Sequence, residues 1–173
     1  MTILMTVAFV TVLALASWSD LRERRIPNVL TLVGVGVALC LRLSWSWGTV
    51  WQGAAGAGLA ILVALAPFAF GFLGGGDVKL LGAVGAFVGV DRLFGALMAV
   101  ALVGGLLAMA EAMRRQAFLR TVANIRGFAQ QWVLFGRAGV TPTIESPEAM
   151  TVPYGVAIAV GSLAWWFYGG ASL

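Results

Sequence analysis

Long apolar runs, separated by only a few charged residues, make up most of this chain and limit the folds open to it. Of its 173 residues, 61% are hydrophobic and 10% are charged, and the mean hydropathy is +0.96. A soluble domain carries about 25% charged residues. One small core cannot hide so many apolar side chains, so the sequence predicts an all-α integral membrane protein.

A membrane-spanning helix needs about 20 mostly apolar residues, and six segments come near that length. They cover residues 3–19, 29–43, 50–73, 78–90, 93–113 and 152–168. The fourth is short, and we expect it to be tilted or partly re-entrant. The first lacks a basic region and a cleavage site, so we expect a retained helix and not a signal peptide. We therefore predict a single membrane domain over residues 1–173, a polytopic bundle of about six transmembrane helices.

The segment between the fifth and sixth runs, residues 114–151, has a different character. Its apolar residues recur at three- and four-residue spacing, as in Phe118, Val122, Ile125, Ala129 and Trp132. This pattern predicts a basic amphipathic helix on the cytoplasmic membrane surface. The alternative is a solvated linker.

The positive charges are unevenly shared between the two sides of such a bundle. With six spans, only Arg42 and Arg92 lie in loops on one side, and the other basic residues lie on the opposite side. The positive-inside rule then predicts that both termini lie outside the cytoplasm. Asp20 and Asp77 would share the cytoplasmic level, and Asp91 would lie at the far face.

Histidine is absent, and Cys40 is the only cysteine. A zinc protease of the His-Glu-x-x-His kind is therefore excluded, and an internal disulfide is impossible. A catalytic role for Cys40 is not expected, because no histidine exists to activate it. We expect no metal and no other cofactor.

Asp20 and Asp77 each lie at the boundary of an apolar run. Ionisable groups near the hydrocarbon are costly and usually serve a function. Two neighbouring carboxylates titrate as a pair, in which one holds a proton and the other is a base. Such a pair hydrolyses an amide without metal, His or Cys. The glycine run 74–76 would let an extended peptide come close.

Each of these residues also has a simpler interpretation. Asp20 can be a plain helix-end charge paired with Arg24 or Arg25. Asp77 can cap the fourth helix, where a negative charge suits the helix dipole. Lys79 can be no more than a positive anchor on the inner side.

Three stretches resemble the type IV prepilin peptidases, most closely the short form found with tight-adherence (Flp-type) pilus systems. They are Asp-Leu-Arg-Glu-Arg-Arg-Ile-Pro-Asn at 20–28, Gly-Gly-Gly-Asp-Val-Lys-Leu-Leu at 74–81, and Pro-Tyr-Gly-Val-Ala-Ile at 153–158. The second matches the family's Gly-x-Gly-Asp-x-Lys signature. Archaeal preflagellin peptidases share the two-aspartate plan, but the third stretch and the chain length fit the bacterial short form better.

The resemblance implies that Asp20 and Asp77 are the catalytic pair. It implies that other residues shape the site or bind substrate: Pro27, Asn28, Gly74, Gly76, Lys79, Pro153 and Tyr154. The expected activity is removal of a short basic leader from prepilins or pseudopilins, just after a glycine, at the cytoplasmic face of the bacterial inner membrane. The expected partners are the prepilin, the bilayer and the pilus assembly system, with no nucleic acid. Long members carry an extra domain with paired cysteines, associated with N-methylation. This chain lacks that insert, so no methyltransferase activity is expected.

Two other functions fit the same residues. Asp20 and Asp77 can form the proton relay of a small proton-coupled carrier, although we find no inverted repeat of the kind that carriers show. The chain can also be a structural assembly subunit, in which Gly82, Gly85 and Gly89 serve close helix packing.

Overall fold

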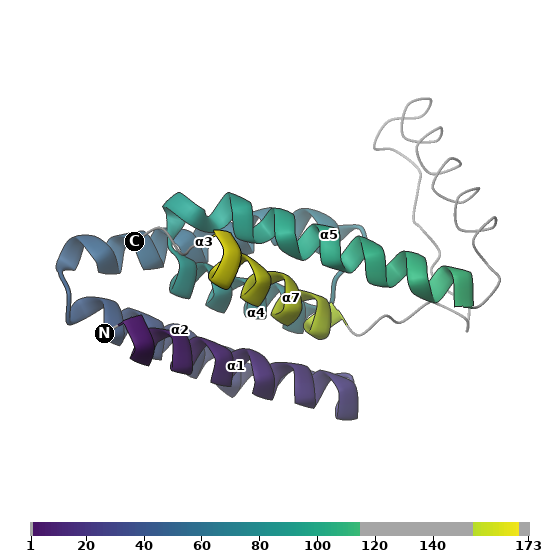
Figure 1. Cartoon of the computed structure of the whole chain (residues 1–173), viewed down its shortest axis with the longest axis horizontal. Helices are drawn as coiled ribbons and strands as arrows, with labels where there is room; N and C mark the ends of the chain where they lie inside the picture. The colour runs from purple at the N-terminus through teal and green to yellow at the C-terminus, as the bar shows by residue number, and fades with distance from the viewer. Residues whose placement is uncertain (1, 115–153, 170–173) are drawn as a thin grey trace. The chain divides into compact units, whose positions relative to one another are not determined.

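The computed structural model describes residues 2–114 and 154–169, and every regular element within these two ranges is helical (Figure 1). The elements are α1 (Thr2–Glu23), α2 (Asn28–Leu43), α3 (Trp47–Ala69), α4 (Gly75–Val88), α5 (Val90–Arg114), α7 (Tyr154–Ala164) and the π-helical turn η1 (Trp165–Gly169). The predicted amphipathic helix over 114–151 lies, apart from Arg114, outside the described residues.

The chain divides into two compact units. One comprises residues 1–104 and 153–173, and the other comprises residues 105–152. In the second unit the structure describes only the end of α5. There Arg114 Nε lies 3.4 Å from Glu111 Oε2. Residues three positions apart lie on one face of a helix, so this ion pair is local to α5.

Three of the described helices are long and apolar enough to cross a membrane: Ile3–Glu23, Trp47–Ala69 and Val90–Glu111. Asn28–Leu43 is a shorter apolar helix. Helix α4 has 14 residues. At 1.5 Å per residue it is about 21 Å long, less than the hydrocarbon thickness of about 30 Å. The helical membrane class is therefore supported and α4 is short as expected, but the count of six spans stays a prediction.

The outer surface of the first unit is strongly apolar. Large side chains such as Val29, Leu32 and Phe94 are each more than 70% exposed. So many exposed large apolar side chains are unusual on a soluble monomer. A bilayer would cover it, which agrees with the composition.

Helix α4 lies at the centre of the first unit, where it packs against α1, α2, α3 and α7. Every residue from Leu80 to Val88 is buried. Figure 1 also shows α1 (purple) running beside α7 (yellow), and the two helices are in contact. The first turn of α4 is therefore surrounded by helix ends from distant parts of the chain.

Glycines allow the close contact between α3 and α4. A Cβ added to Gly85 would collide with the backbone of Gly56, and a Cβ added to Gly56 would collide with the carbonyl of Gly85. A Cβ on Gly82 would lie 2.9 Å from the Ile61 side chain. The predicted packing role of Gly82 and Gly85 is thus confirmed. Gly89 instead ends α4, with a positive φ of 83°.

Several predicted boundaries were wrong, among them the end of α3, which lies at Ala69 and not at residue 73. Helix α1 does not stop at Ser19 but continues through Asp20 to Glu23, because Asp-Leu-Arg-Glu contains no helix-breaking residue. The chain turns at Arg24, whose φ is 50°. The glycine run does not separate α3 from α4 in full, because α4 begins inside it at Gly75. The start of α4 is stabilised by the side chain of Asp77, which accepts a hydrogen bond from the Gly74 N–H.

Candidate active site at the first turn of α4

Asp20 lies in the last turn of α1 and is only 8% exposed. Its Oδ2 accepts a hydrogen bond of 2.8 Å from the main-chain N–H of Gly155, which is 135 residues away in sequence. Gly155 belongs to the first turn of α7. Asp20 is therefore a buried carboxylate joined to another helix, and not an exposed charge at a helix end.

Asp77 is the third residue of α4 and lies outside the three candidate spans. Its Oδ2 accepts a hydrogen bond of 2.9 Å from the main-chain N–H of Gly74. Asp77 thus caps α4, from the third helical position and not from the N-cap. Burial raises the pKa of the Asp77 carboxyl; the Gly74 N–H lowers it, and the negative charge of Asp20 raises it further.

The two carboxylates line one cavity of about 560 Å³. The rest of its wall comes from the α1–α2 connection and from the glycines that open α4. These lining residues are Glu23, Arg24, Arg25, Ile26, Pro27, Asn28, Gly74, Gly75 and Gly76. The cavity therefore brings together Asp20, Asp77 and four of the residues expected to shape the site.

Lys79 connects the two sides of this region without lining the cavity. Its Nζ donates a hydrogen bond of 2.7 Å to Asn28 Oδ1. Asn28 is the first residue of α2, and Lys79 is in the second turn of α4. The bond fixes the start of α2 against α4, beside Asp77.

The connection from α1 to α2 is held close to α4. Ser19 Oγ donates to the carbonyl of Arg25 at 2.7 Å. A Cβ on Gly76 would lie 3.2 Å from Ile26 Cβ. The missing side chain at Gly76 therefore gives the connection room to pass over the first turn of α4.

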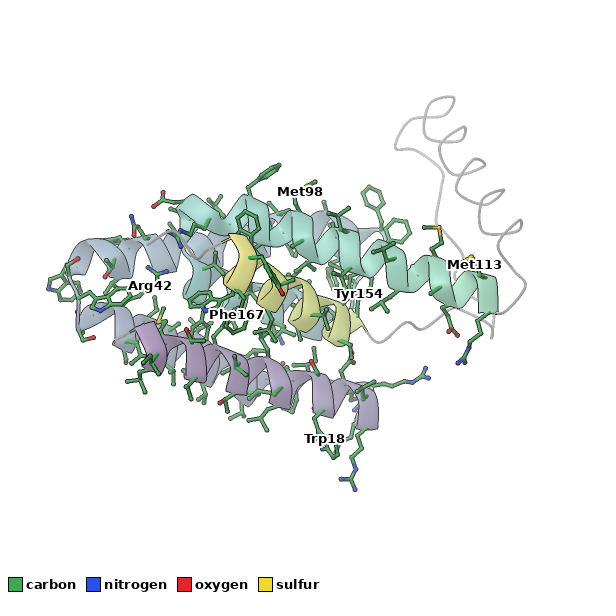
Figure 2. The ribbon with its side chains drawn as sticks, in the orientation of Figure 1. Trp18, Arg42, Met98, Met113, Tyr154 and Phe167 are labelled. Carbon is green, nitrogen blue, oxygen red and sulfur yellow. The ribbon has the colours of Figure 1, made fainter. Side chains whose placement is uncertain are left out.

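Tyr154 begins α7 and is half-buried (Figure 2). Its ring packs against α5, where a Cβ on Gly104 would lie 3.0 Å from the Tyr154 hydroxyl. Pro153 lies outside the described residues. Sequence reasoning missed Gly155, although it stands in the quoted Pro-Tyr-Gly motif, because no local pattern reveals that its amide meets Asp20.

Asp91 is in the first turn of α5. It lies near the start of α1 and the end of α4, whereas the aspartate cavity lies near the end of α1 and the start of α4. A second cavity there, of about 600 Å³, is lined by Asp91, Arg42, Met5 and Val88 among others. Asp91 Oδ2 accepts from Gln52 Nε2 at 2.9 Å. Arg42 is buried and donates to the carbonyls of Ala86 and Phe87, both at 2.9 Å. Asp91 is thus far from the aspartate cavity, as predicted.

Within residues 2–114 and 154–169, no group of three or more His, Cys, Asp or Glu side chains is arranged to hold a metal ion. Among the polar groups at the aspartate cavity, the carboxylates of Asp20 and Asp77 each accept a hydrogen bond from a main-chain N–H. Such a pair, with one proton between its members, supplies both a general base and a general acid.

Residues 7–109 match the sequence profile of the type IV leader peptidase family. The chain belongs to this family. The part that matches the leader peptidases contains Asp20, Asp77 and Lys79 but ends before α7. Membership of the leader peptidase family implies protease activity, and the apolar helices agree with a membrane setting. Comparisons with curated proteins and with solved structures gave no significant match.

Proposed function

We propose that the chain is an aspartic endopeptidase that removes the short basic leader from Flp-type prepilins or pseudopilins. The observation that carries this proposal is that Asp20 and Asp77, from α1 and α4, line one cavity, in which the charge of Asp20 helps to raise the pKa of Asp77. Membership of the leader peptidase family favours this activity over the proton-coupled carrier and the structural subunit.

In the proposed reaction, Asp77 is the acid and Asp20 the base. Asp20 takes a proton from water as the water oxygen attacks the scissile carbonyl carbon, and Asp77 gives its proton to the carbonyl oxygen. The C–N bond then breaks. Asp20 returns its proton to the leaving nitrogen, and the hydroxyl of the intermediate returns a proton to Asp77 as the carboxyl product forms. The raised pKa of the Asp77 carboxyl supports its part as the proton holder.

The basic residues around the site support cleavage at the cytoplasmic face of the bacterial inner membrane. Arg24 and Arg25 line the aspartate cavity, and Lys79 lies beside it. Basic residues at one end of a membrane bundle favour the cytoplasmic side.

The glycines at 74–76 leave room for a peptide backbone next to Asp77. The partners would be the prepilin, the bilayer and the pilus assembly system.

A cleavage assay tests the proposal. The chain is co-expressed with a Flp-type prepilin from the same genome, next to Asp20→Asn and Asp77→Asn variants of equal membrane abundance. We expect each variant to lose at least about a thousandfold in cleavage rate, as when a member of a catalytic unit is removed. Asp91→Asn is the matched control, because Asp91 lies at the other cavity, and it should cleave normally. Normal processing by the Asp20 or Asp77 variant would contradict the aspartic mechanism.

Mass spectrometry of the released pilin tests the remaining part of the proposal. We expect the new N-terminus to follow a glycine and to be unmethylated. A methylated product formed by the purified chain and a methyl donor would contradict the expected absence of methyltransferase activity.

A further inference from the structure

The start of α7 is in direct contact with the Asp20 side chain. Besides the hydrogen bond from the Gly155 N–H, three atoms of Asp20 surround the place where a Gly155 side chain would begin. A Cβ there would lie 2.7 Å from Asp20 Oδ2 and 3.0 Å from both Cβ and Cγ. Real Cβ atoms almost never come so close to a neighbour. A side chain at 155 would therefore require the Asp20 carboxylate to shift from its present position.

This contact comes from outside the matched part of the chain. The family match ends at residue 109, whereas α7 begins at Tyr154. Helix α7 is itself well anchored, since Ala157, Ile158 and Ala159 are buried in the core. A buried helix can hold a hydrogen-bond donor at a fixed place relative to α1, against which it packs.

We propose that Gly155 is a positioning residue of the site: its main-chain N–H orients the Asp20 carboxylate and stabilises its negative charge, so that α7 forms part of the active site. The proposal rests on the proposed peptidase function.

Two physical effects support this role. A hydrogen bond donated to a carboxylate favours its charged form, and the first turn of a helix favours a negative charge beside it. The charged and titratable groups around Asp20 are Asp77, Glu23, Arg24 and Arg25 on the shared cavity, and Tyr154 next to Gly155. A donor aimed at Asp20 Oδ2 restricts the rotation of the carboxylate among these charges.

The first test measures the contact without any substrate. Melting temperatures are compared for the wild-type chain, Gly155→Ala, Asp20→Ala and the double variant, all in the same membrane mimic. Asp20→Ala removes Oδ2 and Cγ, two of the three atoms nearest to the new Cβ. We expect the loss caused by Gly155→Ala to fall to less than about half in the Asp20→Ala background. If Gly155→Ala alone does not accumulate in the membrane, accumulation of the double variant counts as the same rescue. An equal loss in melting temperature with and without Asp20→Ala would contradict the contact between Gly155 and Asp20.

Gly161→Ala is the matched control on the same helix. Its Cβ would lie 2.6 Å from Val100 Cα, far along α7 from Asp20. We expect this substitution to lower the melting temperature by the same amount with and without Asp20→Ala. A rescue of Gly161→Ala by Asp20→Ala would show a general effect on α7 and would overturn the specific role of Gly155.

The second test measures cleavage kinetics at equal amounts of folded protein. Gly155→Ala displaces the carboxylate, and we expect kcat to fall on the order of a hundredfold with KM changed less than about threefold. Gly161→Ala should keep its kcat. A normal kcat for Gly155→Ala would overturn the positioning role. If the wild-type chain cleaves no prepilin, the proposed function has failed, and the melting-temperature cycle still decides whether Gly155 holds Asp20.

Discussion

Asp20 and Asp77 are held by main-chain N–H groups of different origin. Asp20 receives its donor from α7, whereas Asp77 receives its donor from Gly74, just before its own helix. The Asp77 bond is therefore local and also starts α4. The Asp20 bond depends on two helices that meet only in the folded chain.

The pKa of Asp77 has a consequence for stability. Its folded-state pKa is raised, because burial and the charge of Asp20 outweigh the Gly74 N–H. Below the ordinary Asp pKa of about 3.9 the carboxyl is neutral in both states, and no penalty arises. As the pH rises through the raised pKa, the folded state must carry a disfavoured charge. Stability is then lost relative to acid conditions.

We predict that Asp77→Asn raises the melting temperature at neutral pH. The Asn carbonyl can still accept the Gly74 N–H, but the disfavoured charge is gone. The gain should shrink to nothing near pH 4, about the ordinary pKa of Asp. Thermal unfolding of both forms across this pH range checks the prediction, and a gain that does not depend on pH would contradict it.

Helix α4 is stabilised by different means at its two ends and along its middle. The Asp77 carboxylate caps its start. At the end of α4, the guanidinium of Arg42 donates hydrogen bonds to the carbonyls of Ala86 and Phe87. A positive charge is favourable there because of the helix dipole. Between the ends, glycines let α3 approach at backbone distance. These contacts explain how so short a helix holds a fixed position.

We predict that Gly85→Ala strongly destabilises the fold. The new methyl group would collide with the backbone of Gly56, which cannot move aside as a flexible side chain can. Overpacking of this kind costs about 1–3 kcal/mol or more. Gly58→Ala in α3 is the control, because a Cβ at Gly58 meets nothing within 4 Å. Equal melting temperatures for the two variants would contradict the packing argument.

The first unit has a polar cavity at one end and a tryptophan-rich cavity at the other. Asp20, Asp77 and the arginines of the α1–α2 connection line the first, and Trp45, Trp165 and Trp166 line the second. Tryptophan gathers at membrane interfaces, and basic residues gather on the cytoplasmic side. The second cavity also contains Arg42, Asp91 and Arg92, so the membrane side that each end faces stays a prediction.

We predict that the aspartate end faces the cytoplasm. In a Cys40→Ser background, Leu21→Cys reports on this end and Trp47→Cys on the other; both native side chains are exposed. In spheroplasts, a membrane-impermeant maleimide should label Trp47→Cys at once and Leu21→Cys only after lysis. Labelling of Leu21→Cys in intact spheroplasts would contradict the orientation.

Much of the helical architecture could be predicted from local patterns in the chain. Long apolar runs predict helices because a helix pairs its backbone polar groups within one segment, as a bilayer requires. The described helices follow these runs, with shifts where Asp-Leu-Arg-Glu continues α1 and where Gly75 and Gly76 enter α4. Asp20 and Asp77 could be named as candidates because a carboxylate at the edge of an apolar run is costly without a purpose.

Other features depend on residues that meet only when the helices pack. The Asn28–Lys79 bond joins residues 51 positions apart, and the Gly155–Asp20 bond joins residues 135 positions apart. Neither leaves a periodic signal in the sequence, because a main-chain N–H or a single amide side chain looks the same whether or not a partner lies across from it. Local sequence determines where helices form and where a charged side chain is energetically unfavourable. Only the packing of α7 against α1 determines which donor reaches the buried carboxylate.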